Sequence, residues 1–181
     1  STDLGEAADT FVEIITENAD KVDGIKMSLL DADAEIALRR RLPEGVRCYT
    51  GDDFNYPELI AGDERGHSDA LLGIFDPLAP RAAAAVKRLD GADEAGFRAI
   101  LDPTVPLARK VFEAPTFNYK TGVVFLAWLA GHQDHFRMVG GLEAARTIGH
   151  LPEVHDLAQR PGLLDDPDRA ADRSPALPTA A

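Results

Sequence analysis

Apolar residues recur at helical spacing at the start of the chain. Between residues 4 and 22 they follow one another at intervals of three and four positions, as in Leu4, Phe11, Ile14 and Ile15. This period predicts an amphipathic helix with one buried stripe.

Three short apolar runs then alternate with helical segments. The runs predict strands at 22–28, 46–50 and 69–75. The segments between and after them predict a helix that begins at Asp31 and ends before Pro43, a short helix after Asn55, and a helix over 77–89. Alternating strands and helices predict an α/β fold with a parallel sheet.

From residue 93 onward the pattern predicts helices without strands. They are expected over 93–112, interrupted at Pro103 and Pro106, over 116–130, and over 142–150. Residues 161–181 lack apolar periodicity, so the sequence predicts a mobile tail there.

Charge and composition narrow the range of partners and locations. Asp and Glu number 31 against 19 Lys and Arg, a formal net charge of −12. Nucleic acids and anionic membranes bind clustered positive charge, so neither is an expected partner. The longest apolar run, 123–130, is far shorter than the roughly 20 residues that span a bilayer. A single cysteine, Cys48, and no evident secretory signal predict a cytoplasmic protein.

Lys26 is the first candidate for chemistry. Side chains alternate along a strand, so Gly24, Lys26 and Ser28 share one face, opposite Ile25 and Met27. In a sheet covered on both faces, Lys26 would point into the interior near the carboxyl end of its strand. Burial favours the uncharged amine, which attacks carbonyls to form Schiff bases. The alternative is a lysine that reaches solvent or closes a salt bridge.

Gly51, Asp52 and Asp53 follow the second predicted strand directly. Ligand sites of parallel sheets form at the carboxyl ends of strands, and a glycine lets the backbone approach a ligand closely. For the two aspartates, a strand exit with a helix cap is the simpler interpretation.

The remaining polar residues do not indicate a site. His132 and His135 lie three positions apart and His67 lies near Asp69, but no ligand set of known spacing is present, so no metal site is expected. Cys48 is interpreted as a small core residue and Lys120 as a structural or rim residue.

Several motifs occur in a characteristic order: Gly24-Ile25-Lys26, Gly51-Asp52-Asp53, the strand within 66–75, and Pro115 to Lys120 before an apolar helix. In this order the chain, from about residue 4 to residue 145, resembles the C-terminal half of the dihydrodipicolinate synthase / N-acetylneuraminate lyase family. The stretch Tyr49 to Tyr56 is most similar to an uncharacterised actinobacterial, dihydrodipicolinate-synthase-like branch.

The resemblance implies a partial (β/α)8 TIM barrel, its last three strands and their helices, with a C-terminal helical extension. Residues 1–90 would be the barrel half, 91–160 the extension and 161–181 a disordered tail. The family condenses or cleaves 2-keto acids such as pyruvate with aldehydes, through a lysine Schiff base and without a metal or organic cofactor. The resemblance assigns that lysine to Lys26, places Gly51, Ala70 and Leu71 beside the keto acid, and implies a homo-oligomer formed through the C-terminal helices.

The chain also departs from the family pattern. A complete barrel needs about 250 residues, and strands one to five, with the family's carboxylate-binding loop and proton-relaying tyrosine, are not among these 181 residues. Met27 follows the lysine where other members often carry an acidic residue. The expected function is a class I aldolase-type lyase, present as a fragment that is inactive alone. The alternatives are a catalytically inactive half-barrel scaffold or subunit, and a metal-assisted lyase using Asp52, Asp53 and His67.

Overall fold

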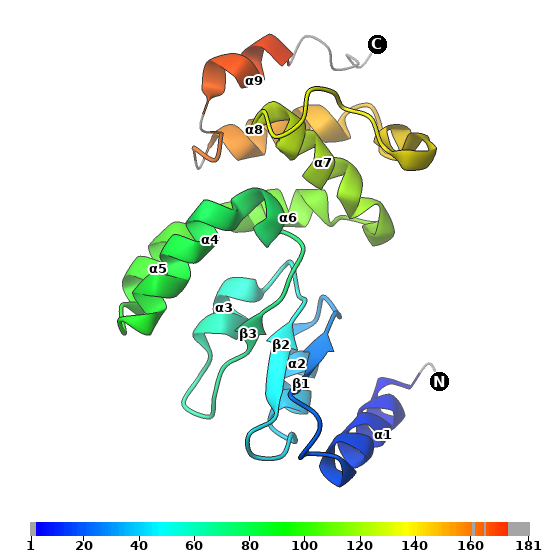
Figure 1. The fold of residues 1–181 in the computed structure, drawn as a ribbon, viewed down its shortest axis with the longest axis vertical. Helices are drawn as coiled ribbons and strands as arrows, with labels where there is room; N and C mark the ends of the chain where they lie inside the picture. The colour runs from blue at the N-terminus through cyan, green and yellow to red at the C-terminus, as the bar shows by residue number, and fades with distance from the viewer. Residues whose placement is uncertain (1–2, 161, 165, 174–181) are drawn as a thin grey trace. The chain divides into compact units, whose positions relative to one another are not determined.

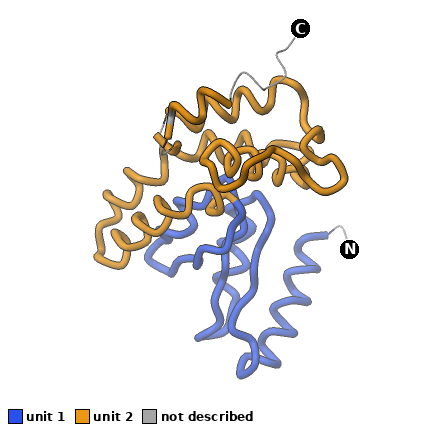
Figure 2. Tube along the Cα trace, turned by 45° about the horizontal axis from the view of Figure 1, so that its top comes forward, with its two compact units in different colours: residues 1–73 blue, residues 74–181 orange. Residues whose placement is uncertain are grey.

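The computed structural model describes all residues except 1–2, 161, 165 and 174–181. The chain divides into two compact units, residues 1–73 and residues 74–181, which Figure 2 colours separately. The sequence predicts a division after residue 90, between a barrel half and a C-terminal helical extension, and that assignment stays a prediction.

Unit 1 alternates helices and strands, as predicted. Its elements are α1 (Leu4–Glu17), β1 (Gly24–Met27), α2 (Ala32–Arg39), β2 (Arg47–Thr50), α3 (Tyr56–Ala61) and β3 (Asp69–Ala70). The strands form one parallel sheet in the order β1-β2-β3 (Figure 1). The α/β class is therefore confirmed, while the partial barrel stays a prediction.

Local signals explain where the elements of unit 1 begin. The carboxylate of Asp31 accepts a hydrogen bond from the amide of Ala34, which caps α2 as the sequence predicts. Asp3 caps α1 in the same way. The third strand, expected over 69–75, is only two residues long, and the chain turns at Gly73 and Ile74 into the helix that begins at Phe75.

The core of unit 1 lies between the sheet and helices α2 and α3. Cys48 and Thr50 of β2 are buried, and they face this helical layer together with Leu38 and Leu59. Helix α1 contributes less to this core than predicted. Its Ile15 is buried, but Leu4, Phe11 and Ile14 are about half exposed. The predicted apolar stripe exists, but it is only partly covered.

Unit 2 is built from helices in the described residues. They are α4 (Phe75–Asp90), α5 (Glu94–Leu101), α6 (Val105–Val111), α7 (Tyr119–Leu129), α8 (His150–Gln159) and α9 (Pro167–Arg173), with short 3-10 turns at Asp102–Thr104, Thr116–Asn118 and Val139–Ala144. The break between α5 and α6 at Pro103 confirms the interruption that the prolines predict. Phe97, Leu107, Phe125 and Val154 are among its fully buried apolar side chains.

Two expectations for unit 2 are corrected. The helix expected over 142–150 is a 3-10 turn that ends at Ala144, and α8 begins only at His150. Pro152 explains this start, because proline is tolerated in the first turn of a helix but not in its interior. In the expected tail, residues 167–173 form α9, and Ala170 is buried. Residues 161, 165 and 174–181 of that tail lie outside the described residues. No helix in the described residues is both long and apolar enough to cross a membrane.

Candidate functional site

The sheet of unit 1 has one face that its helices do not cover. Register partners in a parallel sheet point their side chains to the same side. Lys26 pairs with Tyr49, and Tyr49 pairs with Asp69, so these three side chains lie on one face. This is the face opposite Cys48 and Thr50, and we call it the open face.

Lys26 and Gly51 meet at the carboxyl end of the open face. A Cβ atom placed on Gly51 would lie 2.7 Å from Lys26 Cε and 2.8 Å from Ser28 Oγ. The amide of Gly51 donates a hydrogen bond of 2.5 Å to the carbonyl of Met27. The side chains of Lys26 and Ser28 therefore converge over Gly51, which has no side chain to exclude them.

The predicted burial of Lys26 is wrong for this chain. Its side chain is exposed, because the helices of unit 1 pack on the other face of the sheet. Among the described residues its amine forms no hydrogen bond or ion pair, so of the alternatives the lysine that reaches solvent is seen and the salt bridge is not. The lysine is thus on the predicted face but open to solvent.

Ala70 and Leu71, the other predicted site residues, lie at the carboxyl end of β3. Ala70 pairs with Thr50, and the amide of Leu71 donates to the Thr50 carbonyl at 3.1 Å. By alternation Leu71 follows onto the open face, where its side chain is half exposed. Lys26, Gly51 and Leu71 thus belong to three adjacent strand ends.

Sequence reasoning missed the polar residues at the other end of the open face. The hydroxyl of Tyr49 donates to the carboxylate of Asp23, and this bond is the main reason why the pKa of Tyr49 is raised. Arg47 Nε lies 4.0 Å from carboxylate oxygens of both Asp23 and Asp69. The signal was the spacing itself, because Arg47, Tyr49 and Asp69 continue the alternation that places Lys26, while Asp23 directly precedes β1.

Asp52 is a loop-forming residue, as its simpler interpretation predicts. Its carboxylate accepts hydrogen bonds from the amides of Phe54 and Asn55 and from the Asn55 side chain, at 2.7–3.0 Å. Asp52 is fully buried, whereas His67 is exposed and lies 4.0 Å from Asp69. With its oxygens engaged in the turn, Asp52 does not support the metal-assisted alternative.

The remaining candidates carry no chemistry in the structure. Within the described residues no three His, Cys, Asp or Glu side chains come together to hold a metal ion, and His132 and His135 lie in the segment after α7. Cys48 is buried, which with the nearby Glu35 raises the pKa of its thiol to about 11. It is the predicted core residue, since reactive cysteines are thiolates.

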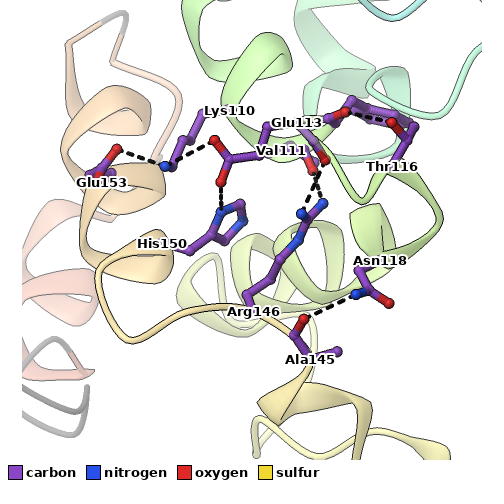
Figure 3. A network of polar contacts seen from close by, with 10 residues as sticks. Lys110, Val111, Glu113, Thr116, Asn118, Ala145, Arg146, His150 and Glu153 are labelled. Carbon is purple, nitrogen blue, oxygen red and sulfur yellow. Dashed lines mark hydrogen bonds and ion pairs between the residues drawn. The ribbon is translucent and has the colours of Figure 1, made fainter.

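Unit 2 contains a second polar cluster, drawn in Figure 3, that sequence reasoning did not find. His150 Nδ1 lies 2.8 Å from Glu113 Oε1, and Lys110 Nζ lies 3.1 Å from Glu113 and 2.7 Å from Glu153. Burial lowers the pKa of His150, and the nearby charges of Arg146 and Lys110 lower it further, while Glu113 opposes them. We call Lys110, Glu113, Arg146, His150 and Glu153 the His150 network; His150 is fully buried and Glu153 is exposed.

Arg146 ties this network to the backbone. Its guanidinium donates to the carbonyls of Val111 and Glu113, at 2.9 and 3.0 Å, at the end of α6. These carbonyls have no partner within the helix, so Arg146 acts as a C-terminal cap. Most of the charged groups of the network bond one another or the backbone, although Arg146 Nε and His150 Nε2 have no partner within the described residues, and we interpret the cluster as structural. No sequence spacing indicates it, since Glu113 and His150 are 37 positions apart.

Comparison with known proteins identifies a family but no reaction or ligand. A family model described as "Protein of unknown function (DUF993)" matches residues 1–179. No curated protein matches the chain.

Proposed function

The chain belongs to the DUF993 family, and we propose that it supplies the Schiff-base half of a class I aldolase-type lyase acting on a 2-keto acid such as pyruvate. One observation carries the proposal. The side chain of Lys26, whose amine has no partner within the described residues, lies over a glycine at the carboxyl ends of parallel strands, the end at which α/β folds place their ligand sites.

The chemistry follows from the amine of Lys26. Its uncharged form adds to the ketone carbon of the 2-keto acid, and the resulting carbinolamine takes up a proton and loses water to give an iminium ion. The iminium accepts the electron pair of the adjacent carbon–carbon bond, or of the carbon–hydrogen bond whose proton departs, which gives an enamine. Gly51, Ala70 and Leu71 would border the keto acid, and the Ser28 hydroxyl lies with the Lys26 side chain over Gly51. No metal or organic cofactor takes part in these steps.

The proposed enzyme needs more than these strands. In our proposal the sheet is the last three strands of a (β/α)8 barrel, and the missing strands cover the open face and bury Lys26. The partners would be a 2-keto acid and an aldehyde, with no nucleic acid or membrane, in a cytoplasmic homo-oligomer formed through the C-terminal helices. The chain alone is expected to be inactive.

Borohydride trapping tests the proposal. The full-length protein is incubated with pyruvate and sodium borohydride, digested, and analysed by mass spectrometry. We expect one reduced pyruvate adduct, on Lys26, that is lost in Lys26→Arg. Lys21→Arg is the matched control, because Lys21 is also exposed and lies in the same unit, and it should keep the adduct. Labelling that persists in Lys26→Arg, or no labelling with any 2-keto acid, would reject the proposal.

One observation favours the scaffold alternative. Lys26 is exposed, and β1 and β3 each leave an edge of the sheet unpaired in unit 1, which is typical of a surface that pairs with another segment. A scaffold predicts that Lys26→Arg leaves every activity of the assembled protein unchanged.

A further inference from the structure

Unit 2 contains a small apolar cavity between its helices α4, α6 and α7 (Figure 1). Its volume is about 100 Å³. Protein interiors are close-packed and hold few voids larger than a water molecule, so a cavity of this size calls for an explanation. Its apolar lining includes Leu78 of α4, Leu107 of α6, Leu126 and Ala127 of α7, and Leu164.

The walls of this cavity belong to the core of unit 2. Leu78, Leu107, Leu126 and Leu164 are all buried, and α7 packs against both α4 and α6. Apolar walls offer water no hydrogen bond, so a cavity of this kind stays dry. An apolar group that enters it gains the dispersion contacts that the walls lack while the cavity is empty.

Two polar residues line the same cavity. Asp76, in the first turn of α4, and His132, which follows α7, are the exposed members of the lining, so they lie where the cavity opens to solvent. In the part of the chain that the structure describes, the Asp76 carboxylate forms no hydrogen bond or ion pair. The cavity therefore combines an apolar interior with a free carboxylate at its mouth.

The end of α7 explains why His132 lies at this mouth. Gly131 has a φ of +84°, and its amide donates to the carbonyl of Trp128 at 3.0 Å. The amide of His132 donates to the carbonyl of Ala127 at 2.9 Å. These two bonds form a Schellman motif, which turns the chain back toward the last turn of the helix and favours glycine at the left-handed position. This wall of the cavity is therefore determined by the local sequence.

The size and charge of the cavity select a class of ligand. An apolar cavity of roughly 150 Å³ takes up benzene, so in proportion this cavity accommodates about four carbon atoms. The carboxylate at its mouth attracts a cation and repels an anion. A short alkyl chain that ends in an ammonium group matches both features.

We propose that this cavity binds a short primary alkylammonium ion, with the alkyl chain between α4, α6 and α7 and the ammonium group at the carboxylate of Asp76. The lining lies wholly within unit 2, so the proposal does not rest on the Schiff-base chemistry proposed for unit 1. For a ligand with so few atoms and an exposed ion pair, we expect a dissociation constant of about millimolar size.

Titrations of the full chain measure this binding. The ¹⁵N-labelled chain is titrated with n-butylammonium, and with butan-1-ol and butyrate as uncharged and anionic probes of the same length. We expect n-butylammonium to shift the amide signals of Leu78, Ala127 and Ala130 with one common dissociation constant. Its affinity should exceed that of butan-1-ol by about threefold, the size of effect of an exposed ion pair, and butyrate should bind most weakly.

Each of the other results overturns the proposal. If n-butylammonium does not shift these signals to saturation, the cavity is not a binding site. If butan-1-ol or butyrate binds as tightly as n-butylammonium, the ligand class is wrong.

Two substitutions separate the role of the charge from that of the cavity. Asp76→Asn should lower the affinity for n-butylammonium to that for butan-1-ol. Ala127→Leu fills the cavity from α7 and should abolish the binding of both. The matched control is Ala84→Leu, at an exposed alanine of α4 that does not line the cavity, and it should leave binding unchanged.

Asp76→Asn decides the proposal even if Ala127→Leu does not fold, because Asp76 is exposed and its replacement leaves the core intact. A preference for n-butylammonium over butan-1-ol that persists in Asp76→Asn contradicts the proposal. Binding that persists in a folded Ala127→Leu chain contradicts it as well.

Discussion

Unit 1 and unit 2 use their charged side chains differently. On the open face of unit 1, Lys26 is exposed and has no partner within the described residues, and Arg47 stands 4.0 Å from its nearest carboxylates. In the His150 network of unit 2, Lys110 and Glu113 are engaged by partners at 2.7–3.1 Å, and His150 is fully enclosed. The Lys26 amine of the open face is accessible to solvent, whereas the His150 network links α6 to α8.

The difference shows how burial separates structural from chemical groups. A charged group inside a protein must be paired, so removing one member leaves the other unsatisfied and costs stability. A group on the surface carries little stability and stays available for binding or reaction. Four experiments test this distinction between the two units.

The largest effect is expected at the His150 network. His150→Ala removes a fully enclosed ring from the start of α8 and leaves Glu113 without its bond. We expect a loss of about 3 kcal/mol in the free energy of unfolding of unit 2. Urea unfolding measures it, and His135→Ala, at an exposed histidine of the same unit, should change it by less than about 0.5 kcal/mol. Equal effects of the two variants would show that the network is not structural.

The second effect concerns the close approach at Gly51. A methyl group in Gly51→Ala would lie 2.7 Å from the Met27 carbonyl oxygen as well as from Lys26 Cε. Lys26 can move aside but the backbone of β1 cannot, so we expect a loss of about 2 kcal/mol in unit 1, typical of overpacking.

Gly149→Ala is the matched control for Gly51→Ala. Its new methyl group would lie 3.7 Å from the nearest atom, Glu153 Oε1, which is an ordinary contact. Urea unfolding should therefore show no loss of stability. If Gly51→Ala were as stable as the wild type, β1 and β2 would be farther apart than described.

Sequence patterns predicted the elements that local residues determine. Short apolar runs predicted the first two strands. The carboxylate of Asp31 predicted the cap of α2, and the missing N–H of Pro103 predicted the break between α5 and α6. The convergence of Lys26 and Gly51 also follows, because parallel strands align their carboxyl ends.

What depends on distant contacts could not be predicted in this way. The exposure of Lys26 depends on what covers a sheet face, and alternation alone does not say that. Glu113 and His150 meet only because α6 and α8 pack together. The start of α8 was missed although Pro152 signals it, because the apolar residues before it also have helical spacing.

The third prediction uses pH, to which the two units should respond in opposite directions. Burial lowers the pKa of His150 below its ordinary 6.5, so its contribution to stability is present above pH 6.5 and is lost as pH falls through the folded value. Burial raises the pKa of Glu113, but His150 and Lys110 outweigh this effect and lower it. The contribution of Glu113 to stability is therefore also lost as pH falls, at lower pH than that of His150.

In unit 1 the pH dependence of stability has the opposite sign. Burial raises the pKa of Glu35 above 4.5, so its contribution is present below pH 4.5 and is lost as pH rises through the folded value. Between pH 7.5 and pH 5 we expect α8 to lose about 1 kcal/mol of protection, since one unit of pKa shift is worth about 1.4 kcal/mol, and α2 to gain protection.

Hydrogen exchange of peptides from α2 and α8, corrected for the intrinsic exchange rate, measures both responses. His150→Gln should remove most of the response of α8 and leave that of α2. A common direction in both units would show that a global property, such as net charge, governs the pH response.

The smallest effect is expected at Lys26 itself. Its side chain is exposed and has no partner in the part of the chain that the structure describes, so Lys26→Ala should change the free energy of unfolding by less than about 0.5 kcal/mol in urea unfolding. If the variant loses about 2 kcal/mol or more, a loss typical of buried groups, the amine holds the sheet together as His150 holds unit 2. If stability is kept while the borohydride adduct disappears, the residue is retained for reaction, because a lysine that contributes no stability has no structural reason to point over Gly51.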